Sequence, residues 1–313
     1  METANAGREV KVKTLRTVWV GCVETGFFIA KKLLAGGVTP AAIVSIDPDM
    51  AARAKVSGYK DLGELPCDCP RYYPERYNLS TAKDLEFFTS GKFDCLIILG
   101  WQRLIPDEII RSLQVCGITI HGSAEGLPRG RGRSPLNWAI IEGHREFHLS
   151  LLTLEPGADA GRILATTTFD ILPSDTIRTL YYKNAIASSR MLLETLPDLA
   201  PGMGEVQDES LATYYPKRTP EDGKIVWDQP LRQTDQLIRA VTRPYPGAFT
   251  FGKNGKLMIW RAQQFDTRLC SHARPGTVIA VFPDGNFLVA CPDGDLIVLD
   301  YEGLPPSEGE VLE

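Results

Sequence analysis

Two side chains in this sequence stand where turns follow apolar segments, and together they could move a proton. His121 comes directly after the apolar run at 115–120, and Asp159 lies in the turn PGADAG at 156–161. In such a pair the carboxylate orients the imidazole while the ring exchanges the proton. Each residue also has an ordinary explanation, because a histidine can end a strand as a hydrogen-bonding residue and aspartate is frequent in turns. Their positions therefore make the two residues candidates for catalysis and no more.

Two further patterns point to cofactors, but each lacks an essential part. Gly21 and Gly26 could suggest a dinucleotide loop, yet VGCVETG lacks the full glycine pattern of such a loop and has no clearly placed acidic ribose ligand. Cys67 and Cys69 resemble half of a metal site, yet no second pair of Cys or His has the matching spacing. The sequence therefore predicts neither a nicotinamide cofactor nor a metal.

Strands that alternate with helices must position the candidate pair. This alternation predicts an α/β fold with a mostly parallel sheet in three layers. The predicted strands lie at 17–23, 41–47, 93–100 and 115–122, with an added strand pair at 147–155 and 161–171 and a closing helix at 174–196. Ser174 is the expected N-cap of that helix. Ligands gather at the carboxyl edge of such sheets, where GWQRLIP (100–106) is expected to join His121 and Asp159.

The second half of the chain has a different pattern. A stretch rich in Pro and Gly predicts a linker over 201–225. Short alternating strands separated by turn signals such as PDG and GKNG then predict a small β-barrel-like domain over 226–313. The first domain, over 1–200, is left to carry the chemistry.

Composition narrows the class of protein. With 313 residues, 43% hydrophobic and 23% charged, the chain is expected to form two globular domains. A net charge of −5 with scattered Lys and Arg disfavours a nucleic-acid partner. Seven cysteines, an odd count without a secretory signal, predict reduced thiols in a cytoplasmic protein. The apolar runs are too short to cross a membrane.

Two segments resemble a known family. GITIHGSAEGLPRGRGRSPLNWAIIEG (117–143) and LTLEPGADAGRIL (152–164) are similar to the signature of the folate-dependent formyltransferases. His121, Leu127-Pro128, Arg131-Gly132 and Asp159-x-Gly161 match the family pattern in order. The resemblance continues in YYPKRTPEDGKIVW and IRAVTRPYPGAF, and it is strongest to the nucleotide-linked amino-sugar N-formyltransferases, with methionyl-tRNA formyltransferase also similar. It covers most of residues 15 to 260.

The resemblance implies a fold, a reaction and a set of site residues. It implies a Rossmann-like domain that transfers a formyl group from N10-formyltetrahydrofolate, as co-substrate, to the amine of a small acceptor, with a nucleotide-linked amino sugar favoured. His121 would stabilise the oxyanion or shuttle a proton, Asp159 would accept a proton and orient His121, and Thr119 would be a substitute donor. Expected folate contacts are Gly100, Trp101, Gln102, Arg103, Leu104, Ile105, Gly157 and Ala158, and expected acceptor contacts are Ser123, Arg131 and Arg133.

The sequence departs from the family pattern at two places. Thr119 stands where the family has Asn, and two extra residues lie between Ser123 and Leu127. Loss of one oxyanion donor commonly costs about 10²- to 10³-fold in rate. Alternative readings are therefore formylation of another amine, such as hydroxyornithine or methionyl-tRNA, or a catalytically inactive protein that binds folate or a nucleotide. A homodimer is a further expectation that the sequence leaves open.

Overall fold

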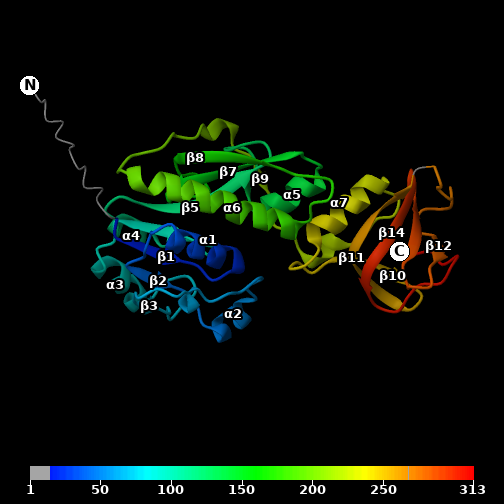
Figure 1. Ribbon diagram of the computed structural model, residues 1–313, viewed down its shortest axis with the longest axis horizontal. Coiled ribbons are helices and arrows are strands. Elements are labelled where there is room, and N and C mark those ends of the chain that lie inside the picture. Colours follow the sequence, from blue (N-terminus) through cyan, green and yellow to red (C-terminus); the bar gives the residue numbers. More distant parts are fainter. Residues whose placement is uncertain (1–14, 267) are drawn as a thin grey trace, which may run out of the picture.

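The computed structural model describes residues 15–266 and 268–313, so residues 1–14 of the predicted catalytic domain lie outside the described residues. Its larger part is built around a seven-stranded sheet (Figure 1). In spatial order the strands are β3 (Arg71–Tyr72), β2 (Ala42–Val44), β1 (Thr17–Val20), β4 (Cys95–Ile98), β5 (Cys116–Ser123), β7 (Glu146–Thr153) and β8 (Ile163–Asp170). The first five run parallel, whereas β7 and β8 pair antiparallel. The predicted mostly parallel α/β fold is confirmed.

Helices cover both faces of this sheet and produce the three predicted layers. They are α1 (Glu24–Ala35), α2 (Pro48–Ala54), α3 (Ala82–Ser90), α4 (Asp107–Ser112), α5 (Pro135–Ile141) and α6 (Ile177–Thr195). α1, α5 and α6 bury Ile29 and Leu180, among others, in one core, and α2, α3 and α4 bury Phe88 and Ile109 in a second. Every residue of β1 and β4 is buried, because a central parallel strand is covered on both sides.

The long helix α6 begins later than predicted. Thr176 is its N-cap, since the Thr176 side chain accepts from the backbone N–H of Thr179 and the Thr179 hydroxyl accepts from the N–H of Thr176. Before it, the N–H of Asp175 donates to the carbonyl of Leu172 at 2.9 Å and closes a turn. The N-cap prediction at Ser174 is wrong because Ser174 lies inside that turn.

The chain after α6 returns along the larger domain before it forms a second lobe. β9 (Tyr214–Tyr215) pairs in parallel with β6 (Arg131–Gly132). Short 3₁₀ turns in this part of the chain lie at Leu196–Asp198, Glu209–Leu211 and Pro220–Gly223, and another lies earlier, at Leu62–Glu64. The stretch predicted as a linker therefore contacts the larger domain, while the domain boundaries near residues 200 and 225 stay predictions.

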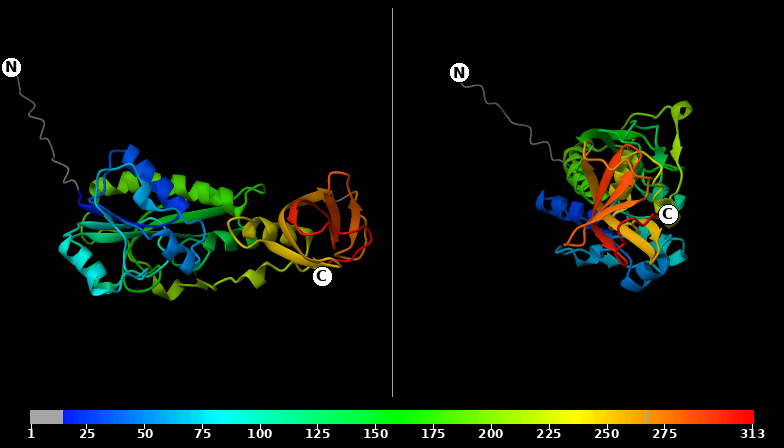
Figure 2. Two further views of the ribbon diagram at one scale, coloured as in Figure 1. Left: turned by 90° about the horizontal axis from the view of Figure 1, so that it is seen from below. Right: turned by 90° about the vertical axis from the view of Figure 1, so that its right-hand side faces the viewer.

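The second lobe lies at one end of the molecule (Figure 2). After α7 (Leu231–Val241) comes an antiparallel sheet whose strands in spatial order are β10 (Ala248–Gly252), β11 (Gly255–Asp266), β14 (Gly294–Glu302), β13 (Phe287–Cys291) and β12 (Val278–Val281). The N–H of Glu313 donates to the backbone carbonyl of Phe251 at 2.8 Å, and the N–H of Val278 donates to the backbone carbonyl of Glu310 at 2.8 Å. The C-terminal segment thus joins both outer strands, which gives the predicted barrel-like form. Among the described residues, no helix has the length and apolarity needed to span a membrane.

Candidate functional site

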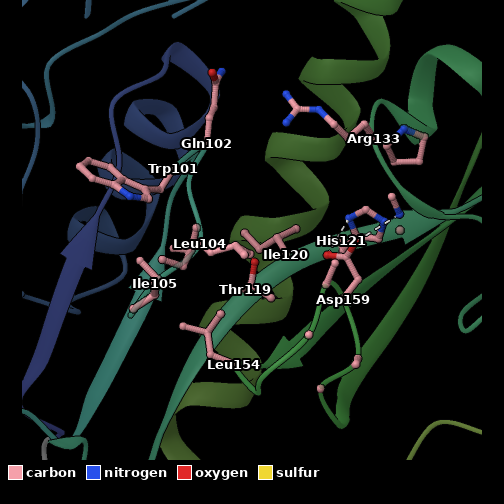
Figure 3. A pocket seen from close by; sticks show the side chains of 18 of the residues that line it. Trp101, Gln102, Leu104, Ile105, Thr119, Ile120, His121, Arg133, Leu154 and Asp159 are labelled. Carbon is pink, nitrogen blue, oxygen red and sulfur yellow. Dashed lines mark hydrogen bonds and ion pairs between the residues drawn. The ribbon is translucent and has the colours of Figure 1, made fainter. Parts of the chain in front are cut away.

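The two candidate acid-base residues meet at the edge of the sheet. His121 lies near the end of β5, and Asp159 lies in the turn between β7 and β8 (Figure 3). Their side chains face each other, with His121 Nδ1 3.3 Å from Asp159 Oδ1. The backbone N–H of Gly132 donates to the other carboxylate oxygen of Asp159 at 3.3 Å. Strand β5 and this turn therefore form one polar site.

The local backbone explains why the turn has the sequence Asp-x-Gly. Asp159 has a φ of +56°, in the left-handed region that Asp and Asn tolerate better than most residues. A Cβ atom at Gly161 would lie 1.7 Å from the carbonyl oxygen of Thr153. Only glycine allows the turn to come back this close to the end of β7. The motif places the carboxylate beside β5.

Electrostatics favour a neutral His121. Burial lowers the pKa of His121 below its ordinary value, the Asp159 carboxylate acts in the opposite direction, and the positive charge of Arg131 lowers it further. A neutral imidazole that donates from Nδ1 to Asp159 carries its lone pair on Nε2. Among the described residues, His121 Nε2 is buried without a hydrogen-bond partner. This nitrogen is therefore available to accept a proton.

A cavity of about 590 Å³ adjoins the pair. One side is apolar and is formed by Trp101, Leu104, Ile105 and Leu154 (Figure 3). The lining also contains the predicted residues Thr119, His121, Gln102, Arg103, Arg133, Gly157, Ala158 and Asp159. The structure thus brings most of the predicted site residues to one cavity.

The segment from Trp101 to Ile105 rests on an aromatic support. The ring of Trp101 packs edge-on against the ring of Tyr77, with the two ring centroids 4.7 Å apart. The guanidinium of Arg103 lies 4.7 Å from the centre of the same Tyr77 ring. The backbone N–H of Gln102 donates to the Tyr77 hydroxyl at 3.2 Å. Leu104 is 78% exposed, so it forms an open apolar lip on the cavity.

Thr119 lies on the same strand as His121, two residues earlier, and both line the cavity. Alternate residues of a strand project to the same side, and Figure 3 shows the Thr119 hydroxyl between the apolar side and the His121–Asp159 pair. A hydroxyl at this position can donate one hydrogen bond to a bound group.

Three predicted site residues lie outside the cavity lining. Gly100 has a φ of +79°, and a Cβ there would lie 2.1 Å from Val23 Cγ2, so its part is to shape the backbone. Ser123 is fully buried, and its hydroxyl accepts from the N–H of Glu125 at 3.1 Å. Arg131 is also fully buried, and its guanidinium bonds to Gln207, Glu209 and Tyr214. The predicted acceptor contacts thus reduce to Arg133 at the cavity.

Sequence reasoning missed the residues that helix α6 and the segment after α7 contribute. Tyr181 and Asn184 of α6 and Tyr245 line the cavity. The hydroxyls of Tyr181 and Tyr245 are 2.5 Å apart. Tyr245 belongs to the segment IRAVTRPYPGAF, whose family resemblance was a signal for its place in the site. For Tyr181 and Asn184 a helical pattern gives no comparable signal.

Comparison with known proteins agrees with this arrangement. Residues 40–196, half of the chain, match the family described as formyl transferase, and residues 217–304 match the formyl transferase C-terminal domain. The chain therefore belongs to the formyl transferase family, as the sequence resemblance predicted.

Several solved structures share the fold. HypX from Aquifex aeolicus in complex with tetrahydrofolic acid is 17% identical, with 96% of this chain and 46% of that chain covered and a TM-score of 0.61. Methionyl-tRNA formyltransferase from Clostridium thermocellum is 17% identical, with coverages of 93% and 99% and a TM-score of 0.58. An N-formyltransferase from Helicobacter canadensis in complex with folinic acid and dTDP-3-aminofucose is 13% identical, with coverages of 92% and 100% and a TM-score of 0.60. The chain spans about half the length of HypX.

Proposed function

We propose that this protein transfers a formyl group from N10-formyltetrahydrofolate to the amine of a small acceptor, and that the acceptor is a nucleotide-linked amino sugar. The observation that carries the proposal is the His121–Asp159 pair, with a buried and unpartnered Nε2, beside a cavity that has an apolar side. Membership of the formyl transferase family supports the reaction type.

The residues support a defined sequence of proton transfers. The acceptor amine attacks the formyl carbon and forms the new C–N bond, while His121 Nε2 takes the amine proton. Asp159 stabilises the imidazolium through Nδ1, and the Thr119 hydroxyl donates to the developing oxyanion. The bond between the formyl carbon and N10 of the folate then breaks, and the proton on His121 passes to N10.

The apolar side of the cavity is the proposed folate site. A pterin is flat and carries polar edges, so it needs an apolar slot with free backbone groups beside it. The backbone groups of Leu104 and Ile105 make no hydrogen bond with other described residues, and both residues line the cavity. The tetrahydrofolic acid and folinic acid bound to two proteins of the same fold support this assignment.

The other side of the cavity is the proposed acceptor site. Arg133 supplies a positive charge for a phosphate, and Asn184 and the Tyr181–Tyr245 hydroxyl pair supply hydrogen-bonding groups for a sugar. The dTDP-3-aminofucose bound to the Helicobacter canadensis protein supports this acceptor class. A net charge of −5 speaks against methionyl-tRNA. Seven free cysteines support a cytoplasmic location, and the homodimer stays a prediction.

The deciding experiment is a formyl-transfer assay with N10-formyltetrahydrofolate. The purified protein is offered a panel of nucleotide amino sugars, hydroxyornithine and methionyl-tRNA, and the absorbance of the tetrahydrofolate product is followed. Turnover with a nucleotide amino sugar, absent in His121→Ala, is the expected result. Folate binding without turnover on any acceptor would favour the inactive binding protein, and absence of folate binding would overturn the proposal.

A further inference from the structure

The buried arginine that does not reach the cavity has another set of partners. Arg131 donates to both carboxylate oxygens of Glu209, at 2.7 and 2.8 Å, and to the side-chain oxygen of Gln207 at 2.8 Å. Gln207 and Glu209 lie in the stretch at 197–216, between the two segments that match the family. An ion pair with a fully buried guanidinium fixes this stretch against the catalytic domain, because breaking it would leave a buried charge unpaired.

Gln207 connects this ion pair to the catalytic turn. Its side-chain nitrogen donates to the carbonyl of Asp159 at 2.9 Å and to the carbonyl of Gly161 at 2.6 Å. Gln207 is 6% exposed. Its side-chain oxygen accepts from Arg131, while its side-chain nitrogen donates to the turn. The first of these carbonyls belongs to Asp159 itself, whose φ of +56° is in the left-handed region. The Gln207 amide therefore holds the backbone conformation that aims the Asp159 carboxylate at His121.

The same group of residues acts on the charge of the site. Arg131 precedes Gly132, whose N–H donates to the Asp159 carboxylate. The positive charge of Arg131 also lowers the pKa of His121, while Glu209 offsets part of that charge. Other charged groups lie close to the turn. Glu155 and Arg162 stand at its two ends, with their side chains 4.0 Å apart. Glu205 pairs with β8 at Ile163, and Arg133 lines the same cavity.

We propose that Gln207 is a positioning residue for formyl transfer, which fixes Asp159 against His121 and is itself held by the Arg131–Glu209 ion pair. The inference rests on the proposed function, since it assumes that the His121–Asp159 pair moves the proton. Gln207 touches neither the cavity nor the reacting atoms and acts only through the backbone of the turn. The stretch between the two lobes thereby sets the geometry of the catalytic pair.

The test compares Gln207→Leu with Ser210→Ala, an exposed substitution in the same stretch. Leucine keeps much of the volume of glutamine but cannot donate to the two carbonyls. We expect kcat to fall about 10²-fold, as for a displacement of a reacting group by about 1 Å, while KM for the formyl donor changes by less than about twofold. Ser210→Ala should retain both values.

A second readout does not depend on turnover. The titration of His121 is followed by NMR, with the signal assigned from His121→Ala. Loosening of Asp159 removes the group that favours the imidazolium, so the pKa of His121 should fall in Gln207→Leu and not in Ser210→Ala. If the wild type proves inactive, this titration still tests the positioning role, so failure of the two proposals can be distinguished.

Glu209→Gln is a second variant for the case that Gln207→Leu misfolds. It should fold, because the Glu209 side chain is 60% exposed. It leaves the charge of Arg131 less neutralised, so it too should lower the pKa of His121. An unchanged His121 titration and an unchanged kcat in folded Gln207→Leu and Glu209→Gln would overturn the inference. A lower melting temperature alone would show a merely structural role.

Discussion

The two sides of the cavity are fixed by different interactions. On the side of His121 and Asp159, hydrogen bonds to the turn and the contact between the two side chains determine where each polar atom lies. On the side of Trp101 to Ile105, aromatic packing on Tyr77 supports a segment whose leucine is open to solvent. Proton transfer requires atoms placed to within fractions of an ångström, whereas binding of a flat ring needs mainly a slot of the right width. We therefore expect substitutions on the first side to change kcat, and substitutions on the second side to change KM.

The largest effect should come from the catalytic pair itself. His121→Ala removes the proton acceptor, and Asp159→Asn removes the charge that stabilises the imidazolium. Each should lower kcat about 10²- to 10⁴-fold, measured with the acceptor found in the panel. Circular dichroism should show both variants folded, since neither side chain belongs to an apolar core. Near-normal turnover in both would exclude the proposed mechanism.

The next effect concerns the residue that departs from the family pattern. Thr119→Val keeps the shape of the side chain and removes its hydroxyl, so kcat should fall about 10²-fold if that hydroxyl stabilises the oxyanion. Thr119→Ser, which keeps the hydroxyl, is the matched control and should retain most of the rate. KM for the formyl donor should stay the same in both. Equal rates for Thr119→Val and the wild type would assign the oxyanion to another donor.

A smaller effect is expected from pH. The proposed reaction needs a neutral His121, and burial lowers its pKa below the ordinary value in the folded protein. The midpoint of the acid limb should therefore lie below the ordinary histidine value of about 6.5, so more than half of the activity should remain at that pH. The profile of kcat against pH, with an acceptor amine whose own ionisation is known, checks this. An acid limb above about 6.5 would mean that Asp159 outweighs burial.

The sequence could predict the site residues that local patterns mark, but not those that depend on contacts between distant parts of the chain. His121 and Asp159 were found because the strand end and the Gly-flanked turn are local patterns. Arg131 was expected to contact the acceptor because its motif is also local. Its real partners, Gln207 and Glu209, lie 76 and 78 residues away, and only the folded chain decides that they enclose it.

The fold shows the same limit. The positions of the main strands along the chain and the barrel-like lobe were predicted from apolar runs and turn signals, which are properties of short segments. The Tyr181–Tyr245 contact joins α6 to the segment before the second lobe, 64 residues later, and no periodicity encodes such a pairing. The N-cap of α6 was misplaced by two residues because Ser174 and Thr176 are both acceptable caps, and the turn before the helix decides between them.

The smallest effect should come from the aromatic support of the folate side. Tyr77→Phe keeps the ring against Trp101 but removes the acceptor for the N–H of Gln102. Loss of one such hydrogen bond costs about 1 kcal/mol, so KM for the formyl donor should rise about fivefold while kcat is unchanged. Tyr73→Phe, whose hydroxyl bonds to Asp61 instead, is the matched control and should leave KM as it is. If Tyr77→Phe lowered kcat at constant KM, the segment from Trp101 to Ile105 would also set the position of the formyl carbon, and the contrast between a side that binds and a side that reacts would no longer hold.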